Sequence, residues 1–396
     1  MKVNQIYSLL NDINAQMFGD DALDVHDLSG IISMGQSIVG DGTETDKFLG
    51  KLVDRIGKTV IRTLDLELEF PTLFMESFEF GAVLQKITVS PFDSIQASEW
   101  EIGTDGFEPT FADVNKNAKV FVRYFTDSDT WKFQTTIPDD LFTTAFTSES
   151  MMAQFIDAIV NAMTDSMTIA LNNMSRTAIN NFIAEKIKGN NGVIDLLAGY
   201  NALLGSGNEI TADAAMHDKE FARYASQEIR KYVKYLGQPS VLYNMGDGNS
   251  GKVLRATSRD NMHVLMLTDL VSLFDAYLLS DSFKDLYDLP NFSEVAYWQG
   301  NKGESANNTF AINSSIAVTP SSEDGELSPT DVEQSGIVCV LADRQAIAVG
   351  LNKRRAGSFY NSIDAYSNIS STATMQYIND LSENGIVFVV DGNSNF

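Results

Sequence analysis

Apolar residues recur every three or four positions from Glu149 to Lys188 without an intervening proline, and this is the clearest pattern in the chain. The period is that of an α-helix with one apolar side, and Gly189 is placed to cap its C-terminus. At about 1.5 Å per residue, such a helix would be about 60 Å long. We therefore expect one long helix that acts as a spine for other elements. Its methionines are interpreted as core filler: Met151, Met152, Met163, Met167 and Met174.

Shorter apolar patterns predict a mixture of helices and strands in the rest of the chain. Apolar residues at helical spacing predict helices over Lys219–Leu236 and Leu270–Phe283. Short apolar runs bounded by polar or glycine-containing segments predict strands. These strands are expected at Phe78–Ser90, Ala118–Phe125, Trp131–Ile137, Ser240–Met245, His263–Thr268 and in four runs between Gly336 and Val390. Together these elements predict an α+β fold.

The N-terminal segment, residues 1–46, carries few apolar side chains and is interpreted as an arm without a core of its own. It begins with a short amphipathic helix that has Ile6, Leu9, Leu10 and Ile13 on one side. An acidic stretch, Asp20–Asp27, and a glycine-punctuated segment, Gly30–Gly42, follow. Residues 47–75 are expected to join the arm to the body as a helix that ends near Gly57 and an extended strand.

Residues 76–140 are expected to contain a long excursion between strands. A segment of this length with few apolar residues at its tip cannot stabilise itself, so we expect it to lie on another surface. Its middle is acidic, with Asp93, Glu99, Glu101, Asp105, Glu108 and Asp113. Large aromatic residues near it favour such a contact: Trp100, Phe107, Phe111, Phe121 and Trp131. Both this excursion and the arm are expected to find cover only on neighbouring copies.

Composition restricts the classes of function. The chain has 53 Asp and Glu against 28 Lys and Arg, a net charge of −25, and such an acidic surface repels polyphosphate. One cysteine and three histidines argue against a disulfide framework, a multi-thiolate zinc site and a His-based metal site. No apolar run approaches the about 18–20 residues of a membrane span. The N-terminus lacks a signal-peptide pattern, so we expect a soluble protein of a reducing compartment.

One motif could bind a nucleotide. Residues Gly246–Val253 fit G-x-G-x-x-G and all but the last position of G-x-x-x-x-G-K-[ST], where Val253 replaces the hydroxyl that would hold magnesium. Such loops cradle phosphate with backbone N–H groups when they join a strand to a helix. Asp269 follows a second strand, where an acid that binds ribose or a metal could lie. A nucleotide-dependent enzyme that uses Gly246–Lys252 and Asp269 is one hypothesis, and a turn between two strands is the more common alternative.

Other polar residues have simpler interpretations. An acidic cluster without EF-hand spacing is read as a solvated face: Asp20, Asp21, Asp24, His26 and Asp27. Cys339, in an apolar strand, is read as a small buried hydrophobe. Lys353–Arg355 is read as a hairpin tip or as a contact with acidic segments of a neighbouring copy. Since G-x-S-x-G, H-E-x-x-H and C-x-x-C are all absent, no catalytic, cofactor-binding or metal-binding residue is assigned and no cofactor is expected.

Four stretches, taken in order, carry a resemblance to a known family. They are Phe48–Arg62, Phe133–Ile137 with Asp140–Phe146, Ser258–Thr268 with Leu278–Phe283, and Val340–Val349 with Gly385–Val390. Their order and spacing resemble the major capsid proteins of tailed bacteriophages, and specifically the branch found in small podoviruses with prolate heads. In that family Phe133–Ile137 is similar to the returning strand of an extended hairpin called the E-loop.

The resemblance implies the tailed-phage major capsid fold, which has an N-terminal arm, an E-loop β-hairpin, a long spine helix, and peripheral and axial domains. In chain order it implies an arm over 1–46, an arm-to-body helix and strand of the peripheral domain over 47–75, an E-loop over 76–140, a peripheral domain with the spine helix over 141–190, an axial domain over 191–335 and closing strands over 336–396. Gly246–Lys252 then becomes a connection between axial strands.

The function implied by the resemblance is structural and not enzymatic. Copies of the chain would assemble through pentamers and hexamers into an icosahedral or prolate head shell that encloses double-stranded DNA without sequence-specific binding. The E-loop of one copy would lie over the spine helix of the next. A scaffolding protein, a portal and decoration proteins are further expected partners, and a membrane is not. Assembly would take place in the host cytoplasm and the product would be the virion. A secreted adhesive protein is disfavoured because neither a signal peptide nor a repeat is found.

Overall fold

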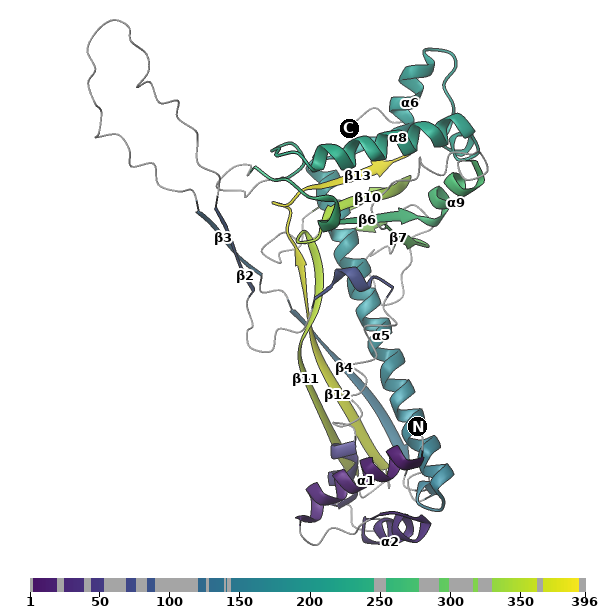
Figure 1. Ribbon diagram of the computed structural model, residues 1–396, viewed down its shortest axis with the longest axis vertical. Coiled ribbons are helices and arrows are strands. Elements are labelled where there is room, and N and C mark those ends of the chain that lie inside the picture. Colours follow the sequence, from purple (N-terminus) through teal and green to yellow (C-terminus); the bar gives the residue numbers. More distant parts are fainter. Residues whose placement is uncertain are drawn as a thin grey trace, which may run out of the picture. The chain divides into compact units, whose positions relative to one another are not determined.

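The computed structural model describes residues 3–19, 25–38, 44–52, 69–75, 84–89, 120–125, 128–138, 140, 144–245, 254–277, 292–298, 316–319, 330–361 and 366–391 (Figure 1). The chain divides into two compact units, each made of three stretches of sequence. The first consists of Met1–Gly81, Asp127–Ala178 and Ala348–Tyr377, and the second of Ala82–Thr126, Ile179–Ile347 and Ile378–Phe396. Both contain helices and strands, so the fold is α+β as predicted.

The sheet of the first unit has four strands in the order β1-β11-β12-β4. They are β1 (Phe74–Met75), β11 (Ile347–Asn361), β12 (Tyr366–Asn379) and β4 (Ser128–Pro138). Along β12, small or apolar residues that point into the unit alternate with partly exposed polar ones, as expected for a strand with one buried face. At the edge of the sheet, β4 pairs with β12 on one side and carries Lys132 and a terminal Pro138.

Contrary to expectation, the N-terminal segment has a core within the first unit. It forms α1 (Val3–Phe18) and α2 (Leu28–Ile38), and residues 44–52 are also helical. Nine apolar side chains of this N-terminal region are completely buried: Leu10, Ile13, Val25, Ile31, Met34, Ile38, Phe48, Leu49 and Leu52. The rings of Phe48 and Phe146 lie 5.8 Å apart. The prediction that this segment finds cover only on neighbouring copies is therefore wrong for its described residues, because residues elsewhere in the same chain complete its core.

The described part of the glycine-punctuated segment, which ends at Ile38, is helical for two reasons. Asp27 caps α2, since its Oδ1 accepts hydrogen bonds from the Ser29 hydroxyl at 2.7 Å and the Gly30 N–H at 2.8 Å. Gly35 allows close packing, because a Cβ at this position would lie 2.7 Å from the ring of Phe146. The glycine therefore marks a helix contact rather than a loop.

The long helix has the predicted bounds and is α5 (Glu149–Lys188). Its predicted apolar stripe is buried almost throughout, but Met151 is exposed and is not core filler. The C-terminus is closed by hydrogen bonds from Asn191 N–H to Lys186 O at 3.1 Å and from Asn190 N–H to Ile187 O at 3.0 Å. In this Schellman arrangement the left-handed residue is Asn190, with φ of 43°, and not the predicted Gly189.

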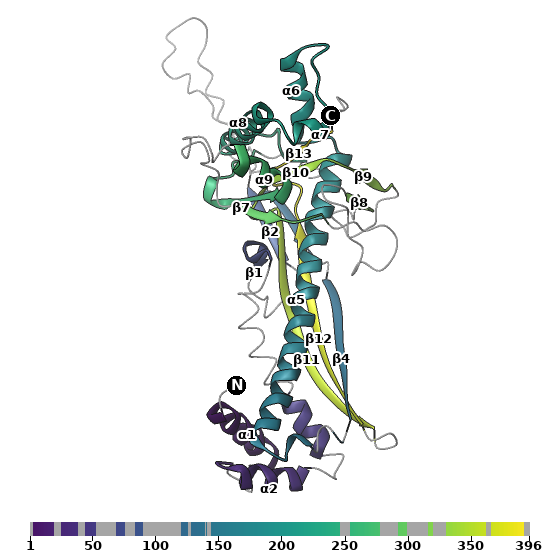
Figure 2. The ribbon, with the colours of Figure 1, turned by 90° about the vertical axis from the view of Figure 1, so that its right-hand side faces the viewer.

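The second unit is built around a five-stranded sheet in the order β5-β13-β10-β6-β7. The strands are β5 (Val193–Asp195), β13 (Gly385–Val389), β10 (Ile337–Asp343), β6 (Met262–Leu267) and β7 (Phe292–Val295). Every residue of β6, β10 and β13 is buried, which fits their continuous apolar sequences. The sheet packs against α6 (Leu196–Leu204), α8 (Lys219–Leu236) and α9 (Thr268–Tyr277) (Figure 2).

Smaller elements complete the second unit. They are the short helix α7 (Ala212–Ala215), the 3₁₀ turn Arg259–Asn261, the pair β8 (Ile316–Val318) with β9 (Val332–Gln334), and the antiparallel ribbon of β2 (Leu84–Val89) with β3 (Val120–Phe125). On the α5 side of the sheet, Phe182 packs so closely on Gly385 that a Cβ there would lie 2.3 Å from its ring.

Three strand assignments need correction. Residues 240–245 form no strand, because only Ser240 makes a bridge, to Arg255, and the following residues are held by isolated hydrogen bonds. Phe133–Ile137 is not the returning strand of the ribbon: β3 has that place, and these residues belong to β4, which pairs with β12. Lys353–Arg355 lies inside β11 and is therefore not a hairpin tip.

Several predictions fall outside the described residues. They concern the helix end at Gly57 with the strand after it, most of the acidic excursion with Trp100, Phe107 and Phe111, the carboxylates Asp20, Asp21 and Asp24, the loop Gly246–Val253, and Leu278–Phe283.

Candidate functional site

One face of the β2–β3 ribbon is apolar and exposed. The strands pair in register from Leu84 with Phe125 to Val89 with Val120. Because side chains alternate between the two faces of a strand, Val122 and Tyr124 share a face of β3, and Ile87 lies directly opposite Val122. The exposed fractions of Ile87, Val122 and Tyr124 are 61%, 41% and 59%. We call these three residues the ribbon face.

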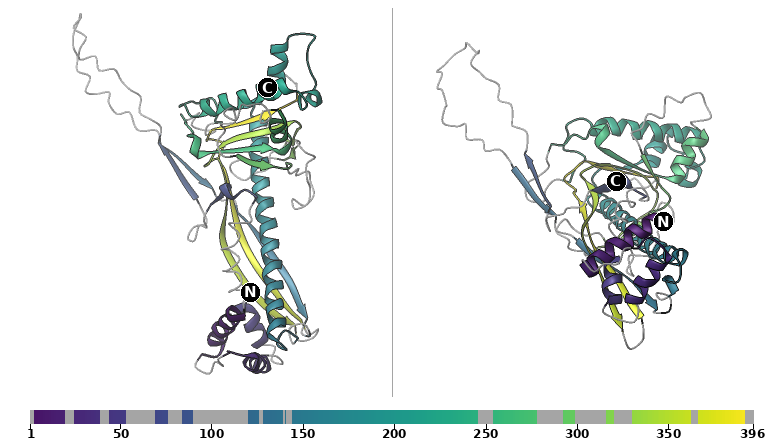
Figure 3. Two further views of the ribbon diagram at one scale, coloured as in Figure 1. Left: turned by 45° about the vertical axis from the view of Figure 1, so that its right-hand side comes forward. Right: turned by 60° about the horizontal axis from the view of Figure 1, so that its bottom comes forward.

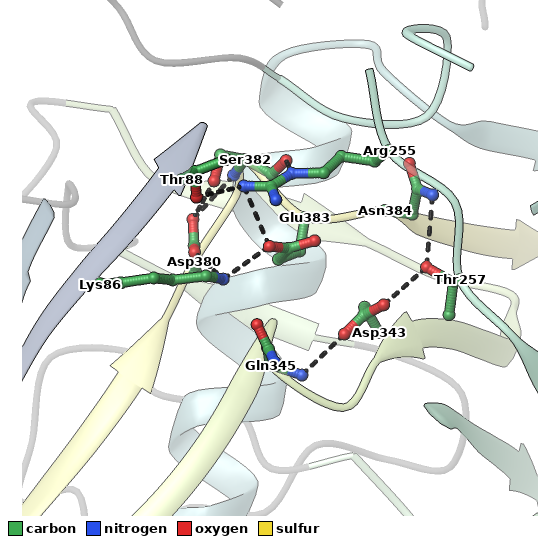
Figure 4. Close-up of polar contacts among 10 residues, drawn as sticks. All are labelled: Lys86, Thr88, Arg255, Thr257, Asp343, Gln345, Asp380, Ser382, Glu383 and Asn384. Atoms are coloured by element: carbon green, nitrogen blue, oxygen red, sulfur yellow. Dashed lines mark hydrogen bonds and ion pairs between the residues drawn. The ribbon is translucent and has the colours of Figure 1, made fainter. Parts of the chain in front are cut away.

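The other face of β2 is anchored by ion pairs to other segments of the second unit, as Figure 4 shows. Lys86 Nζ lies 2.6 Å from Asp380 Oδ2 and 2.6 Å from Glu383 Oε1. Arg255 Nη2 lies 3.0 Å from the same Glu383 oxygen and donates a hydrogen bond to Thr88 Oγ1 at 3.1 Å. The four charged side chains are largely buried, Asp380 completely. We call Lys86, Arg255, Asp380 and Glu383 the ribbon latch.

The acidic half of the latch is shaped by the turn between β12 and β13. Asp380 Oδ1 accepts hydrogen bonds from the Ser382 N–H at 3.0 Å and the Ser382 hydroxyl at 2.6 Å. The Asp380 N–H donates to Ala346 O at 2.8 Å, which ties the turn to the neighbouring chain segment. This Asx-type turn uses one carboxylate oxygen for the backbone and leaves the other for Lys86. The turn itself thus holds the Asp380 carboxylate in the position where it meets Lys86.

A polar pocket of about 320 Å³ lies beside the latch. Its lining consists of Leu254, Arg255, Ala256, Asn261, Asp343, Arg344, Gln345 and Glu383. Asp343 is fixed by the Thr257 hydroxyl at 2.6 Å and by the Gln345 N–H at 2.9 Å, and Asn384 donates to Thr257 Oγ1 at 3.3 Å. Neighbouring groups already bind both carboxylates of the lining, Asp343 and Glu383. This favours a structural role for the pocket over a catalytic one.

The electrostatics of the latch favour a positioning role. Two buried cations face two buried carboxylates, so charges are balanced, and removing one partner would leave an uncompensated charge in a poorly solvated place. Nearby, burial and then the charge of Arg344 lower the pKa of His263 to about 4, so this histidine is neutral near pH 7. Burial raises the pKa of the Cys339 thiol, which makes it an inert group, as predicted. The arrangement holds the ribbon base in one orientation.

Comparison with known proteins decides the family. The model of the Phi29-like phage major capsid protein family matches residues 10–389 of the chain. The chain belongs to this family. Its role is therefore structural, in the capsid of the virion, and the resemblance seen in the sequence is confirmed.

Similar proteins agree with membership of the Phi29-like major capsid family. The major capsid protein of Streptococcus phage Cp-1 is 26% identical over 188 residues, which are 46% of this chain and 50% of that protein. The match thus spans about half the length of the relative. A chain in the capsid structure of Staphylococcus phage Andhra is 12% identical with a TM-score of 0.52, covering 80% of this chain and 83% of that one.

A second solved structure gives the same result. It is a chain from the head fiber and inner core protein structure of native bacteriophage P68, with 11% identity, a TM-score of 0.51, and coverage of 81% of this chain and 84% of that one. At these identities the two likenesses show the fold, and they confirm the prediction of a tailed-phage capsid fold for this Phi29-like protein.

The residues proposed for nucleotide binding do not form a site among the described residues of this Phi29-like capsid protein. The loop Gly246–Val253 lies outside them, and the strand expected before it is absent from 240–245. Asp269 lies in the first turn of α9, directly after β6. A phosphate-binding loop of this kind follows a strand and precedes a helix. On the N-terminal side of the motif, that strand is not observed.

The other predicted positions have structural roles. Asp27 caps α2, and its hydrogen bonds from Ser29 and Gly30 lower its pKa. Within the described ranges, no group of three or more His, Cys, Asp or Glu side chains could hold a metal ion. The same residues include no helix that is long and apolar enough to cross a membrane. Sequence reasoning missed the ribbon latch, for which Lys86 between the apolar residues Leu84 and Ile87 was the available signal.

Proposed function

We propose that this chain is the repeating subunit of a closed head shell, icosahedral or prolate, that forms when copies associate into pentamers and hexamers and that encloses double-stranded DNA. The observation that carries the proposal is the ribbon: its base is fixed by the latch, while Ile87, Val122 and Tyr124 remain exposed. An exposed apolar cluster on a fixed support is typical of a surface that another protein covers.

Burial of the ribbon face would supply part of the association energy. Full burial of an apolar side chain such as that of Ile87 contributes about 1.5–3 kcal/mol relative to exposure. Because the latch orders the ribbon base within the single chain, less conformational freedom remains to be lost when copies meet. The ribbon is therefore a preorganised contact surface, and every subunit of the shell would carry one.

We place the receiving surface on α5 of the next copy. Ile169 and Met151 are exposed apolar residues of α5, although most of the other apolar residues of the helix are buried. They offer apolar area to which a ribbon face can attach. This placement deepens the expectation that one copy's E-loop lies over the spine helix of its neighbour.

The division of the chain into arm, E-loop, peripheral and axial domains and closing strands is retained as part of the proposal. The E-loop corresponds to the region of β2 and β3, and the axial domain to the helices and strands between 191 and 335. The net charge of −25 suits a wall that encloses DNA without gripping it by sequence. A scaffolding protein, a portal and decoration proteins are further partners in this proposal, with assembly in the host cytoplasm.

Sedimentation and negative-stain microscopy of the purified protein test the proposal. We expect closed shells, tubes or capsomer rings. Deletion of residues 90–111 should leave a monomer that forms none of these. Normal particles from the deletion variant would contradict the role given to the ribbon. An intact protein that stays monomeric at high concentration would contradict the function itself.

A further inference from the structure

The chain contains two Asn-Gly pairs, Asn191–Gly192 and Asn384–Gly385, and both lie in the second unit. In such a pair the main-chain nitrogen of the glycine can attack the side-chain amide carbon of the asparagine, because the glycine has no Cβ to hinder the approach. Asparagine is one of the thermolabile residues of proteins. The two pairs share the same local chemistry, so their surroundings decide whether either of them reacts.

The glycine of the first pair is required by the fold. Asn191 and Gly192 lie between the end of α5 and β5, and Figure 3 shows this end of α5, in teal, beside the yellow and green strands of the sheet. Gly192 has φ of 72°, a conformation that residues with a side chain rarely adopt. A Cβ there would also lie 2.5 Å from Gly385 O. Any other residue would be strained, so the fold places a glycine directly after Asn191.

The groups that would react at Asn191 are weakly held. Its Nδ2 lies 3.4 Å from Leu242 O, which is longer than an ordinary hydrogen bond, and its Oδ1 has no hydrogen-bond partner among the described residues. The Gly192 N–H donates no hydrogen bond within the described ranges, although Gly192 O accepts one from the Val387 N–H at 2.8 Å. The side chain of Asn191 therefore has little to lose when it turns toward the Gly192 nitrogen, and that nitrogen breaks no hydrogen bond when it reacts.

The second pair is protected by its contacts. Gly385 begins β13, and its N–H donates to Tyr243 O at 3.0 Å. Asn384 Nδ2 donates to Thr257 Oγ1 at 3.3 Å, and the residue is completely buried. Ring closure at Asn384 would break a main-chain hydrogen bond in a place from which water is excluded, whereas Asn191 is partly exposed. The same dipeptide is therefore open to reaction at one position and closed to it at the other.

We propose that Asn191 is a site of spontaneous deamidation in the folded protein. The Gly192 nitrogen loses its proton to hydroxide and forms a bond to Cγ of Asn191, and the side-chain nitrogen takes up a proton and leaves as ammonia. Water then opens the cyclic imide at one of its two carbonyl carbons, so the product is aspartate or isoaspartate. Water is the only co-reactant, and one neutral amide is exchanged for one carboxylate.

Both products alter the start of β5. The Asn191 N–H donates to Lys186 O at 3.1 Å, which closes α5, and the bond from the Val387 N–H to Gly192 O ties the same segment to β13. Isoaspartate adds one carbon to the main chain between these two hydrogen bonds, so they cannot both keep their geometry. Aspartate leaves the main chain unchanged but replaces the donor that faces Leu242 O by an oxygen, and the two oxygens repel. Each converted copy gains a negative charge and a looser end of α5.

Peptide mass spectrometry of the full-length protein tests the assignment. During incubation in mildly alkaline, heavy-oxygen water, Asn191 should convert at least tenfold faster than Asn384 and its products should carry the heavy oxygen. In concentrated urea the two sites should react at similar rates, because the contacts that protect Asn384 are then lost. Asn191→Gln is the matched control and should stay unmodified, since its longer side chain would have to close a less favourable ring.

Equal rates at the two sites of the folded protein, or an Asn191 that does not convert, would overturn the assignment. A second measurement concerns the effect of the product. Asn191→Asp should unfold at a lower urea concentration than Asn191→Ser, which lacks the charge, and equal midpoints would contradict the repulsion from Leu242 O. The reaction takes place within one copy and needs no neighbour, so its absence would leave the proposed shell function standing.

Discussion

The N-terminal helices and the β2–β3 ribbon differ in where their apolar side chains find cover. In the helices, Leu10, Ile31 and Phe48 are completely buried within the first unit. In the ribbon, Ile87 and Tyr124 are mostly exposed, although the base of the same ribbon is fixed by buried ion pairs. Both segments looked alike in sequence, as pieces too poor in apolar residues to fold alone. The difference teaches that such a segment can be completed by its own chain or left open for another copy.

The largest expected effect concerns the N-terminal helices, whose apolar side chains are covered within the chain. Phe48→Ala should destabilise the monomer by about 3–5 kcal/mol, because it removes a completely buried ring and leaves a cavity beside Phe146. Urea unfolding of the variant that lacks residues 90–111 would measure this. Phe359→Ala is the control, since Phe359 is exposed in the same unit and should change little. Equal, small effects of both substitutions would show that the N-terminal helices are not packed as described.

The next effect concerns the base of the ribbon. Lys86→Met should cost about 3 kcal/mol, because it removes the ammonium group that contacts two buried carboxylates. Lys47→Met is the matched control: Lys47 pairs with Glu44 at the surface, and such pairs contribute about 0–1 kcal/mol. Unfolding free energies from denaturant titration would compare the two. If Lys86→Met were as mild as Lys47→Met, the latch would not hold the ribbon.

Acid should weaken the unit that holds the ribbon base. The pKa of His263 is lowered to about 4 in the folded chain from an ordinary 6.5, so between these values the unfolded chain binds the proton and the folded one does not. Stability is therefore present above pH 6.5 and falls as the pH drops toward 4, by about 2 kcal/mol at pH 5. The difference between wild type and His263→Gln, measured by urea unfolding at pH 8 and pH 5, isolates this group. A pH-independent difference would contradict the assignment.

The smallest effect on monomer stability is expected for the ribbon face, whose side chains are exposed. Ile87→Thr should change monomer stability by less than about 0.5 kcal/mol, because the side chain is exposed and threonine suits a strand. Assembly, followed by sedimentation, should nevertheless fall strongly. Ile32→Thr, at an exposed position of α2, is the counterpart in the N-terminal helices and should leave both properties unchanged. A large loss of monomer stability in Ile87→Thr would mean that the ribbon face is covered within its own chain.

Elements with a long periodic pattern could be predicted from the sequence to the residue. The bounds of α5 and α8 agree with the apolar stripes. Over 40 and 18 residues, the helical period repeats often enough to be distinguished from a chance pattern. The buried strands β6, β10 and β13 were also found, because continuous apolar runs suit a sheet covered on both faces.

Shorter signals failed where a distant residue decides the outcome. The glycines of α2 left the structure of this segment undecided, because whether Gly35 breaks a helix or admits a neighbour depends on Phe146, more than a hundred residues away. Val241 and Leu242 suggested a strand, yet no partner strand passes beside them among the described residues. The latch was out of reach for the same reason: Lys86 and Asp380 are 294 positions apart, and no local pattern links them.

The edge strand β4 has a consequence for the protein before it assembles. A free strand edge is a template on which any extended chain can add itself, and crowded copies would then grow fibres instead of particles. Lys132 places a charge in this edge and Pro138 removes a donor at its end, so uncontrolled stacking is discouraged. A subunit that assembles through specific contacts therefore also needs features that prevent non-specific pairing of its strand edges.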